Sequence, residues 1–347
     1  MPTYKDSKTG KWFCKFYYTD YTGTRKQKCK RGFALKRDAD QWERDFLLKS
    51  AGSPEMTFAA LAGLYLEDLK TRRKPSTVYT RSSAIRLHIM PYFENKPVNH
   101  ITTADIRKWQ NTLLQLNYSA SYLRRINDIM SMVLNFAVRY YNLPFNPCSR
   151  AERIGKHTRS LTFWTLDQYR AALDHVQDPA AHAALQVLFY SGMRYGEMAA
   201  LTPADIDFKE NTICINKTYL KLPGTHYTGT PKTDNSFRVV IMPAPVMEEL
   251  RAYMARLYGL EDNDRIFTFT RGVLRRAMVS ASSAAGVPFI RIHDLRHSHV
   301  SLLIDMGFNP HLIAARIGDT VQMVNNTYGH LYPDKSKSVA DQLNQLF

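Results

Sequence analysis

The stretch RIHDLRH, residues 291–297, lies at the start of a helix that the sequence predicts over residues 291–306. His293 and Arg296 are three residues apart, so both side chains would project from one side of that helix. Leu295 would belong to its apolar, buried side. A histidine close to an arginine on a helix is most often structural, but such a pair on one face also suits the binding of a phosphate.

Two earlier stretches each contribute a cation. In SGMRYGE, residues 191–197, an apolar helix ends at a glycine and Arg194 follows at the start of the next helix, with Glu197 placed to brace it. In GTPKTDNSFR, residues 229–238, Lys232 lies in a turn between two predicted strands, where its side chain can swing. Alone, an arginine–glutamate pair and an exposed lysine are ordinary surface features.

A tyrosine completes the set. Tyr328 lies in NTYGH, residues 326–330, where a helix ends and the chain bends; as one of 20 tyrosines it carries little information alone. Together with the two arginines, the lysine and the histidine, it could perform phosphodiester transesterification without a metal. The tyrosine hydroxyl would attack phosphorus, the arginines would hold the non-bridging oxygens, and the lysine and histidine would transfer protons.

In these residues the chain resembles the tyrosine recombinase (phage integrase) family, whose ordered signature is Arg, Lys, H-x-x-R, His or Trp, and Tyr. The matching residues, in order, are Arg194, Lys232, His293, Arg296 and Tyr328. The resemblance covers about residues 57–347. Residues 1–50 resemble, through the looser pattern Trp12, Gly23 and Gly32-Phe33, the small arm-binding domain of integrases from phages and conjugative transposons.

The resemblance implies a site-specific integrase that cuts and rejoins DNA through a 3'-phosphotyrosyl intermediate, and so integrates and excises a mobile genetic element. It implies no cofactor and no metal. It also implies a homotetramer on double-stranded DNA attachment sites of core and arm type. Accessory proteins that bend the DNA or set the direction of the reaction are further possible partners.

One position departs from the family pattern. In IGDT, residues 317–320, Asp319 occupies the place where the family usually has His or Trp. A carboxylate beside a phosphodiester would be repelled. We expect Asp319 to cap the helix that begins near Thr320; the alternative is that it accepts a hydrogen bond from a neighbouring active-site residue.

The predicted fold is multidomain and mainly α-helical with small β-sheets. Residues 1–50 form an arm-type DNA-binding domain, a three-stranded sheet plus one helix; the strands are predicted near Tyr4 and over 11–18 and 25–31. Residues 56–148 form a helical core-binding domain of four helices, of which the first two are capped by Thr57 and Ser76 and the others span 103–116 and 119–141. Linkers are predicted at 51–55 and 150–160.

Residues 160–347 form a mixed α+β catalytic domain. Its strands are predicted over 211–218 and 236–242, with a turn-rich stretch between them. Its helices are predicted over 165–176, 179–191, 245–258, 271–285, 291–306, 309–317 and 336–345. The last of these could dock on a neighbouring protomer or on its own domain.

Composition narrows the class of partner. The 347 residues carry a net charge of +16, which favours a polyanionic partner such as nucleic acid. Residues 1–32 hold nine Lys and Arg against two Asp. None of the four cysteines forms a C-x-x-C pair, so a zinc site or disulfide framework is not expected. No apolar stretch of about 20 residues and no signal peptide is evident, and we expect a cytoplasmic protein of a bacterial host with no membrane partner.

Three other functions stay open on the sequence. A type IB topoisomerase-like nickase would use similar chemistry, and a chromosome-dimer resolvase would lack the segment 1–50. A catalytically silent DNA-binding protein on a recombinase scaffold would retain the fold and lack cleavage. Covalent attachment to a nicked suicide duplex separates this last class from the enzymes.

Overall fold

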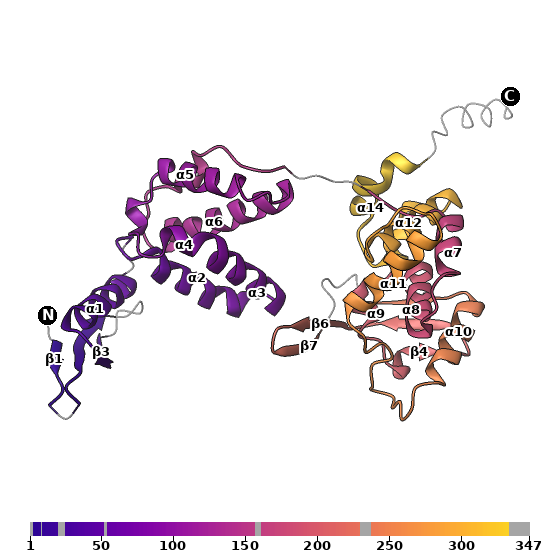
Figure 1. Cartoon of the computed structure of the whole chain (residues 1–347), viewed down its shortest axis with the longest axis horizontal. Helices are drawn as coiled ribbons and strands as arrows, with labels where there is room; N and C mark the ends of the chain where they lie inside the picture. Colours follow the sequence, from indigo (N-terminus) through magenta and orange to yellow (C-terminus); the bar gives the residue numbers. More distant parts are fainter. Residues whose placement is uncertain are drawn as a thin grey trace. The chain divides into compact units, whose positions relative to one another are not determined.

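The computed structural model describes residues 3–7, 9–19, 25–51, 54–156, 161–229 and 237–332, with side chains described except at 48–51. The chain divides into two compact units, Met1–Arg159 and Ser160–Phe347, and each is described by itself (Figure 1). Both are mainly helical with small antiparallel sheets, as the sequence predicts. Within the described residues, no helix is long and apolar enough to cross a membrane.

The first unit begins with a three-stranded antiparallel sheet and one helix. The elements are β1 (Thr3–Lys5), β2 (Trp12–Thr19), β3 (Arg25–Phe33) and α1 (Lys36–Ala51), and the strand order is β1-β2-β3. Alternation along β2 buries Cys14 and Phe16, and the Phe16 ring packs on Phe46 of α1 at a centroid distance of 5.5 Å. The predicted sheet, including its third strand at Tyr4, is confirmed.

The rest of the first unit is helical. Its elements are α2 (Phe58–Arg72), α3 (Pro75–Ala84), the π-turn η1 (Ile85–Ile89), α4 (Met90–Phe93), α5 (Thr103–Leu114) and α6 (Ala120–Tyr140). The side chain of Thr57 caps α2 as predicted, and that of Ser119 caps α6. The cap predicted at Ser76 is wrong: Pro75 opens α3 and Lys74 holds the N-cap position, because proline fits the first turn of a helix.

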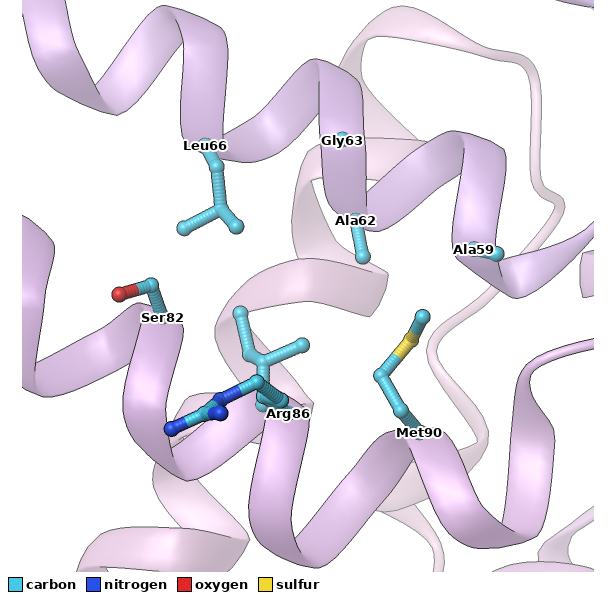
Figure 2. Close-up of a pocket in the computed structure, with 8 residues that line it drawn as sticks. Ala59, Ala62, Gly63, Leu66, Ser82, Arg86 and Met90 are labelled. Carbon is cyan, nitrogen blue, oxygen red and sulfur yellow. The ribbon is translucent and has the colours of Figure 1, made fainter.

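A pocket of about 320 Å³ opens between these helices (Figure 2). Its wall is almost wholly small or apolar, with Arg86 as its one cation. The lining residues are Ala59, Ala62, Gly63, Leu66, Ser82, Ile85, Arg86 and Met90. Such a wall offers van der Waals contact but no group of converging polar atoms that could perform chemistry.

The second unit surrounds the apolar helix α8 (Pro179–Ser191), which contacts α10 and α12. The other helices are α7 (Leu166–Leu173), α9 (Tyr195–Met198), α10 (Ala244–Met254), α11 (Arg271–Ala284), α12 (Asp294–Asp305), α13 (Pro310–Ile317) and α14 (Val321–Tyr328). The strands are β4 (Ile206–Asp207), β5 (Thr212–Ile215), β6 (Thr218–Leu222), β7 (Thr225–Gly229) and β8 (Arg238–Ile241). One sheet has the order β4-β5-β8, and β6 pairs with β7.

Two details of this unit differ from the prediction, and a third is not tested. The stretch expected to be rich in turns contains the β6–β7 hairpin, and the strands beside it are shorter than expected. Helix α12 begins at Asp294, so His293 occupies its N-cap position rather than lying on the helix. The helix predicted over 336–345 lies outside the described residues.

Candidate active site

A glycine bend delivers Arg194 to the site. Helix α8 ends at Ser191, and Gly192 follows with a φ of +66°. A Cβ atom on Gly192 would lie 2.5 Å from Cδ2 of His299, so neither the backbone conformation nor the space admits a side chain. The chain therefore turns sharply, and Arg194 reaches the N-cap position of α9.

Glu197 is the buried partner of that arginine. Only 3% exposed, it accepts hydrogen bonds from Nη1 of Arg194 at 2.9 Å, from the Arg194 backbone N at 3.0 Å and from Nη2 of Arg238 at 2.9 Å. Burial alone would raise the Glu197 pKa, but the guanidinium of Arg238 and then that of Arg194 lower it. The predicted brace is present, as a buried network rather than a surface ion pair.

Arg296 lies in the first turn of α12 and is 3% exposed. Its Nη1 donates to the carbonyl oxygens of Gly192 at 2.9 Å and Ile317 at 2.6 Å. Burial and the nearby Arg194 lower its pKa to about 10, so it stays cationic at neutral pH. Two backbone carbonyls from distant parts of the sequence thus fix one face of this guanidinium.

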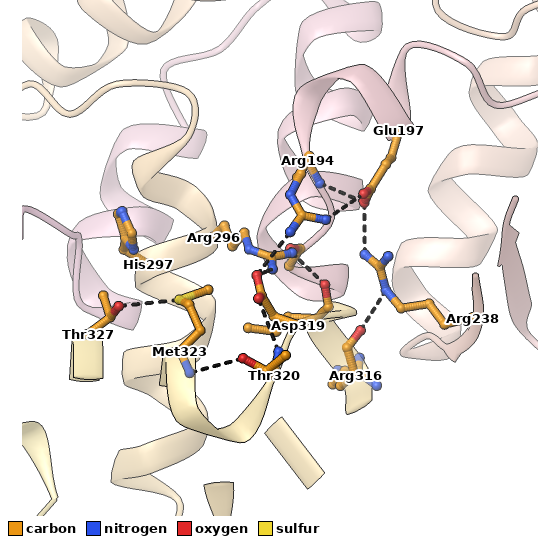
Figure 3. Close-up of polar contacts among 12 residues, drawn as sticks. Arg194, Glu197, Arg238, Arg296, His297, Arg316, Asp319, Thr320, Met323 and Thr327 are labelled. Carbon is orange, nitrogen blue, oxygen red and sulfur yellow. Dashed lines mark hydrogen bonds and ion pairs between the residues drawn. The ribbon is translucent and has the colours of Figure 1, made fainter. Parts of the chain in front are cut away.

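The two arginines meet on Asp319 (Figure 3). Oδ2 of Asp319 accepts from Nη2 of Arg194 at 2.9 Å and from Nη2 of Arg296 at 3.0 Å. The predicted cap at Asp319 is wrong, because the Thr320 hydroxyl accepts the helical N–H of Met323 and caps α14 itself. The alternative, a hydrogen bond from a neighbouring active-site residue, is what the structure contains.

Tyr328 is the last residue of α14 and is 1% exposed. Its ring belongs to an apolar cluster that includes Val300 and Ile317. Its hydroxyl lies 2.5 Å from Nδ1 of His297. Burial raises the Tyr328 pKa to about 12, and the positive charge of Arg296 opposes that rise. A phenol this weakly acidic needs a proton acceptor before its oxygen can attack.

His297 is a site residue that the signature does not include. Its ring centroid lies 5.2 Å from that of His293, and its Nε2 lies 3.9 Å from Oδ1 of the buried Asp294. Burial lowers the pKa of His297, and burial followed by the positive charges of His297 and Arg296 lowers that of His293 to about 4. The four-residue spacing of the two histidines was the available signal, since it places them on one side of the chain.

Arg238 is the second residue that the sequence reasoning missed. It opens β8, and its Nε donates to the carbonyl oxygen of Arg316 at 2.9 Å while its Nη2 binds Glu197. It lies in the same stretch as Lys232, of which the family signature includes only the lysine. Lys232 itself lies outside the described residues.

The structure therefore brings five of the six predicted residues into one connected site; the sixth, Lys232, lies outside the described residues. Arg194 and Arg296 both donate to one carboxylate oxygen of Asp319. The hydroxyl of Tyr328 lies within hydrogen-bond distance of His297, on the helix that carries Arg296. His293 stands at the start of that helix and contacts His297. Positive charge, a buried hydroxyl and an imidazole nitrogen are the groups that a phosphoryl transfer through tyrosine needs.

Three family models match successive parts of the chain. The model of the phage integrase family matches residues 162–335, that of the phage integrase N-terminal SAM-like domain matches 57–114, and that of an arm DNA-binding domain matches 2–50. The chain is 28% identical to the ICEBs1 integrase of Bacillus subtilis over 310 residues, covering 85% of this chain and 84% of the relative. It is 24% identical to the integrase of Staphylococcus phage L54a, covering 88% and 91%.

Solved structures share the fold. The Tn1549 transposon integrase in complex with a circular intermediate DNA superposes with a TM-score of 0.70 at 17% identity, covering 84% of this chain and all of that one. A lambda integrase dimer bound to a core site gives 0.60 at 17% identity, covering 96% and 95%. With a family model that spans half of the sequence, the chain belongs to the phage integrase family of tyrosine recombinases.

Proposed function

We propose that this integrase is catalytically active and cuts DNA with Tyr328 as the nucleophile. The observation that carries the proposal is the convergence of Arg194 and Arg296 on a single oxygen of Asp319. Two guanidinium groups at that spacing can bind two non-bridging oxygens of one phosphodiester and stabilise the charge that develops during attack.

In the proposed step the Tyr328 oxygen forms a bond to phosphorus and the bond from phosphorus to the 5' oxygen breaks. The phenolic proton passes to a histidine; His297 supports this role because its Nδ1 is already 2.5 Å from the hydroxyl, and His293 is the family's counterpart. Lys232 is proposed to protonate the leaving 5' oxygen. The product is a 3'-phosphotyrosine, and attack by a free 5' hydroxyl of another strand restores the tyrosine without net consumption of energy.

We also propose a division of labour along the chain. Residues 1–50 would bind arm-type sites, while 56–148 and 160–347 would hold the core site, in a homotetramer on two DNA sites. Support comes from the open face of the first sheet, where the guanidinium of Arg25 lies 4.8 Å from the Tyr17 ring and that of Arg31 lies 5.2 Å from the Phe13 ring. Cations stacked on aromatic rings provide both phosphate contacts and surfaces for base edges.

Capture on a nicked suicide duplex tests the proposed function. The duplex is taken from the attachment site that borders the element. The nick lies close to the cut, so the short fragment that carries the freed 5' hydroxyl diffuses away and the covalent complex accumulates. We expect a protein–DNA adduct that forms equally well in EDTA, because the arginines supply the positive charge. A chain that binds the duplex but never forms the adduct would be a silent DNA-binding protein, and the proposal would be wrong.

A further inference from the structure

Asp319 occupies the anion position of the site. Its Oδ2 accepts from both arginine Nη2 atoms, at 2.9 Å from Arg194 and 3.0 Å from Arg296 (Figure 3). A non-bridging phosphate oxygen carries a similar charge and would accept from the same two donors. The carboxylate therefore lies where the proposed function needs the scissile phosphate.

The carboxylate and the phosphate would compete. Two unit negative charges about 4 Å apart repel each other by about 1 kcal/mol in water and by about 4 kcal/mol near a protein surface. A carboxylate that stayed in place would therefore weaken phosphate binding by roughly fivefold to roughly a thousandfold. Asp319 is only partly buried, with 19% of its side chain exposed, so it can turn toward solvent. Arg296 has less freedom, because two backbone carbonyls hold its Nη1. Of the two partners, the carboxylate is the one that can leave.

The position of Asp319 connects this competition to the nucleophile. The residue lies between Gly318, which ends α13 with a φ of +66°, and Thr320, the N-cap of α14. Its Oδ1 also accepts the backbone N–H of Thr320 at 3.1 Å. Helix α14 ends with Tyr328, a residue that is 1% exposed. A movement of Asp319 would therefore pull on the cap of the helix that buries the nucleophile.

We propose that Asp319 is a resident counter-ion that the scissile phosphate displaces from both arginines, and that its displacement releases α14 and Tyr328 for attack. The inference rests on the proposed function. Asp319 acts here through Arg194 and Arg296 and is a positioning residue. The His or Trp that is usual in the family at this place carries an N–H that can donate to a phosphate, whereas the carboxylate of this chain can only accept and so competes with it.

Inorganic phosphate is the first probe, because it needs no knowledge of the DNA sequence. The melting temperature of the full chain and of three variants is measured at increasing phosphate concentration and constant ionic strength. The phosphate concentration that gives half of the maximal rise in melting temperature is then compared between them. Asp319→Asn should lower that concentration at least about fivefold. Asp319→Glu, which keeps the carboxylate, should resemble the parent, and Asp305→Asn controls for the loss of one exposed carboxylate from the same unit.

The second probe is the attachment-site duplex in a Tyr328→Phe background, where no cleavage step contributes to the measured affinity. Asp319→Asn should bind this duplex at least about fivefold more tightly than the parent. Hydrogen–deuterium exchange of residues 320–328, measured with Tyr328 present, should be faster in DNA-free Asp319→Asn than in the DNA-free parent. Added phosphate should bring the parent toward the variant.

The outcomes separate the inference about Asp319 from the proposed function. If Asp319→Asn responds to phosphate and duplex as Asp305→Asn does, Asp319 is no competitor and the inference is wrong. If Asp319→Asn weakens duplex binding, the carboxylate supports the arginines rather than excluding phosphate, which also overturns it. Failure of the parent to form a covalent adduct would instead contradict the proposed function, and the phosphate measurement would still decide what Asp319 does.

Discussion

Replacing Glu197 by glutamine should destabilise the second unit by about 3 kcal/mol, the lower end of the cost of breaking a buried ion pair. The carboxylate is 3% exposed and compensates two guanidinium groups, Arg194 and Arg238. Glutamine keeps the shape but removes the negative charge, and its amide nitrogen would face one of the donors. We expect the lower end because Arg238 keeps its hydrogen bond to the carbonyl of Arg316.

Urea unfolding of the full chain, followed by circular dichroism, measures this loss. Glu210→Gln, at an exposed position of the same unit, is the matched control for the change in net charge. The pKa of Glu197 is lowered from 4.5 in the folded chain, so the stability it contributes is complete above pH 4.5 and is lost as the pH falls through the folded pKa. The difference between parent and variant should therefore shrink at acidic pH.

A loss below about 1 kcal/mol, or one that does not change with pH, would refute this reasoning, because a buried charged acceptor cannot be removed at so small a cost. The cleavage rate gives a second reading. Arg194 loses the partner that fixes its Nη1, so the rate should fall even at urea concentrations where the variant is fully folded.

Three further predictions concern the chemistry and the modules. Arg194→Ala and Arg296→Ala should each raise the activation free energy of cleavage by about 3 kcal/mol, which lowers the rate more than a hundredfold, and lysine at either position should rescue only part of the rate. A loss of rate within about threefold in single-turnover assays would count against the phosphate-binding role. Cleavage should stay constant from about pH 8 down to 6.5 and fall below it, since the lowered pKa of His297 keeps the imidazole neutral and able to accept a proton; a rate that falls already above pH 6.5 would contradict this. Removing residues 1–55 should leave core cleavage largely intact and abolish binding to arm sites, and the isolated module should bind those sites with strong salt dependence in shift assays; binding to no DNA at low salt would disprove the arm-binding role.

Much of the fold follows from local sequence. The alternation in β2 and the cap at Thr57 have short-range causes, and both lie where the sequence predicts them. The β6–β7 hairpin was missed because Thr, Tyr, His and Lys around Gly224 look like a turn-rich loop, and the pairing of its two strands is a tertiary event.

In the site, too, contacts between residues far apart in the sequence could not be predicted from local sequence. Residue types and their order predict Arg194, Arg296 and Tyr328 as site residues, and the structure places the three in one connected network. The contacts of Glu197 with Arg238, and of His297 with Tyr328, depend on elements that are 41 and 31 residues apart in the chain. Local rules predict a cap at Asp319, but two cations that are distant in the sequence, the buried Arg296 and the partly buried Arg194, attract its carboxylate more strongly than one backbone N–H does.

Mapping the residue that carries DNA tests the central claim most directly. The adduct trapped on a suicide duplex is digested with protease and nuclease, and the peptide that retains a nucleotide is sequenced by mass spectrometry. The account predicts a single modified peptide with the nucleotide on the Tyr328 oxygen, joined through a 3' phosphate, and no adduct from Tyr328→Phe. A nucleotide on any other residue, or a Phe variant that still forms the adduct, would contradict it.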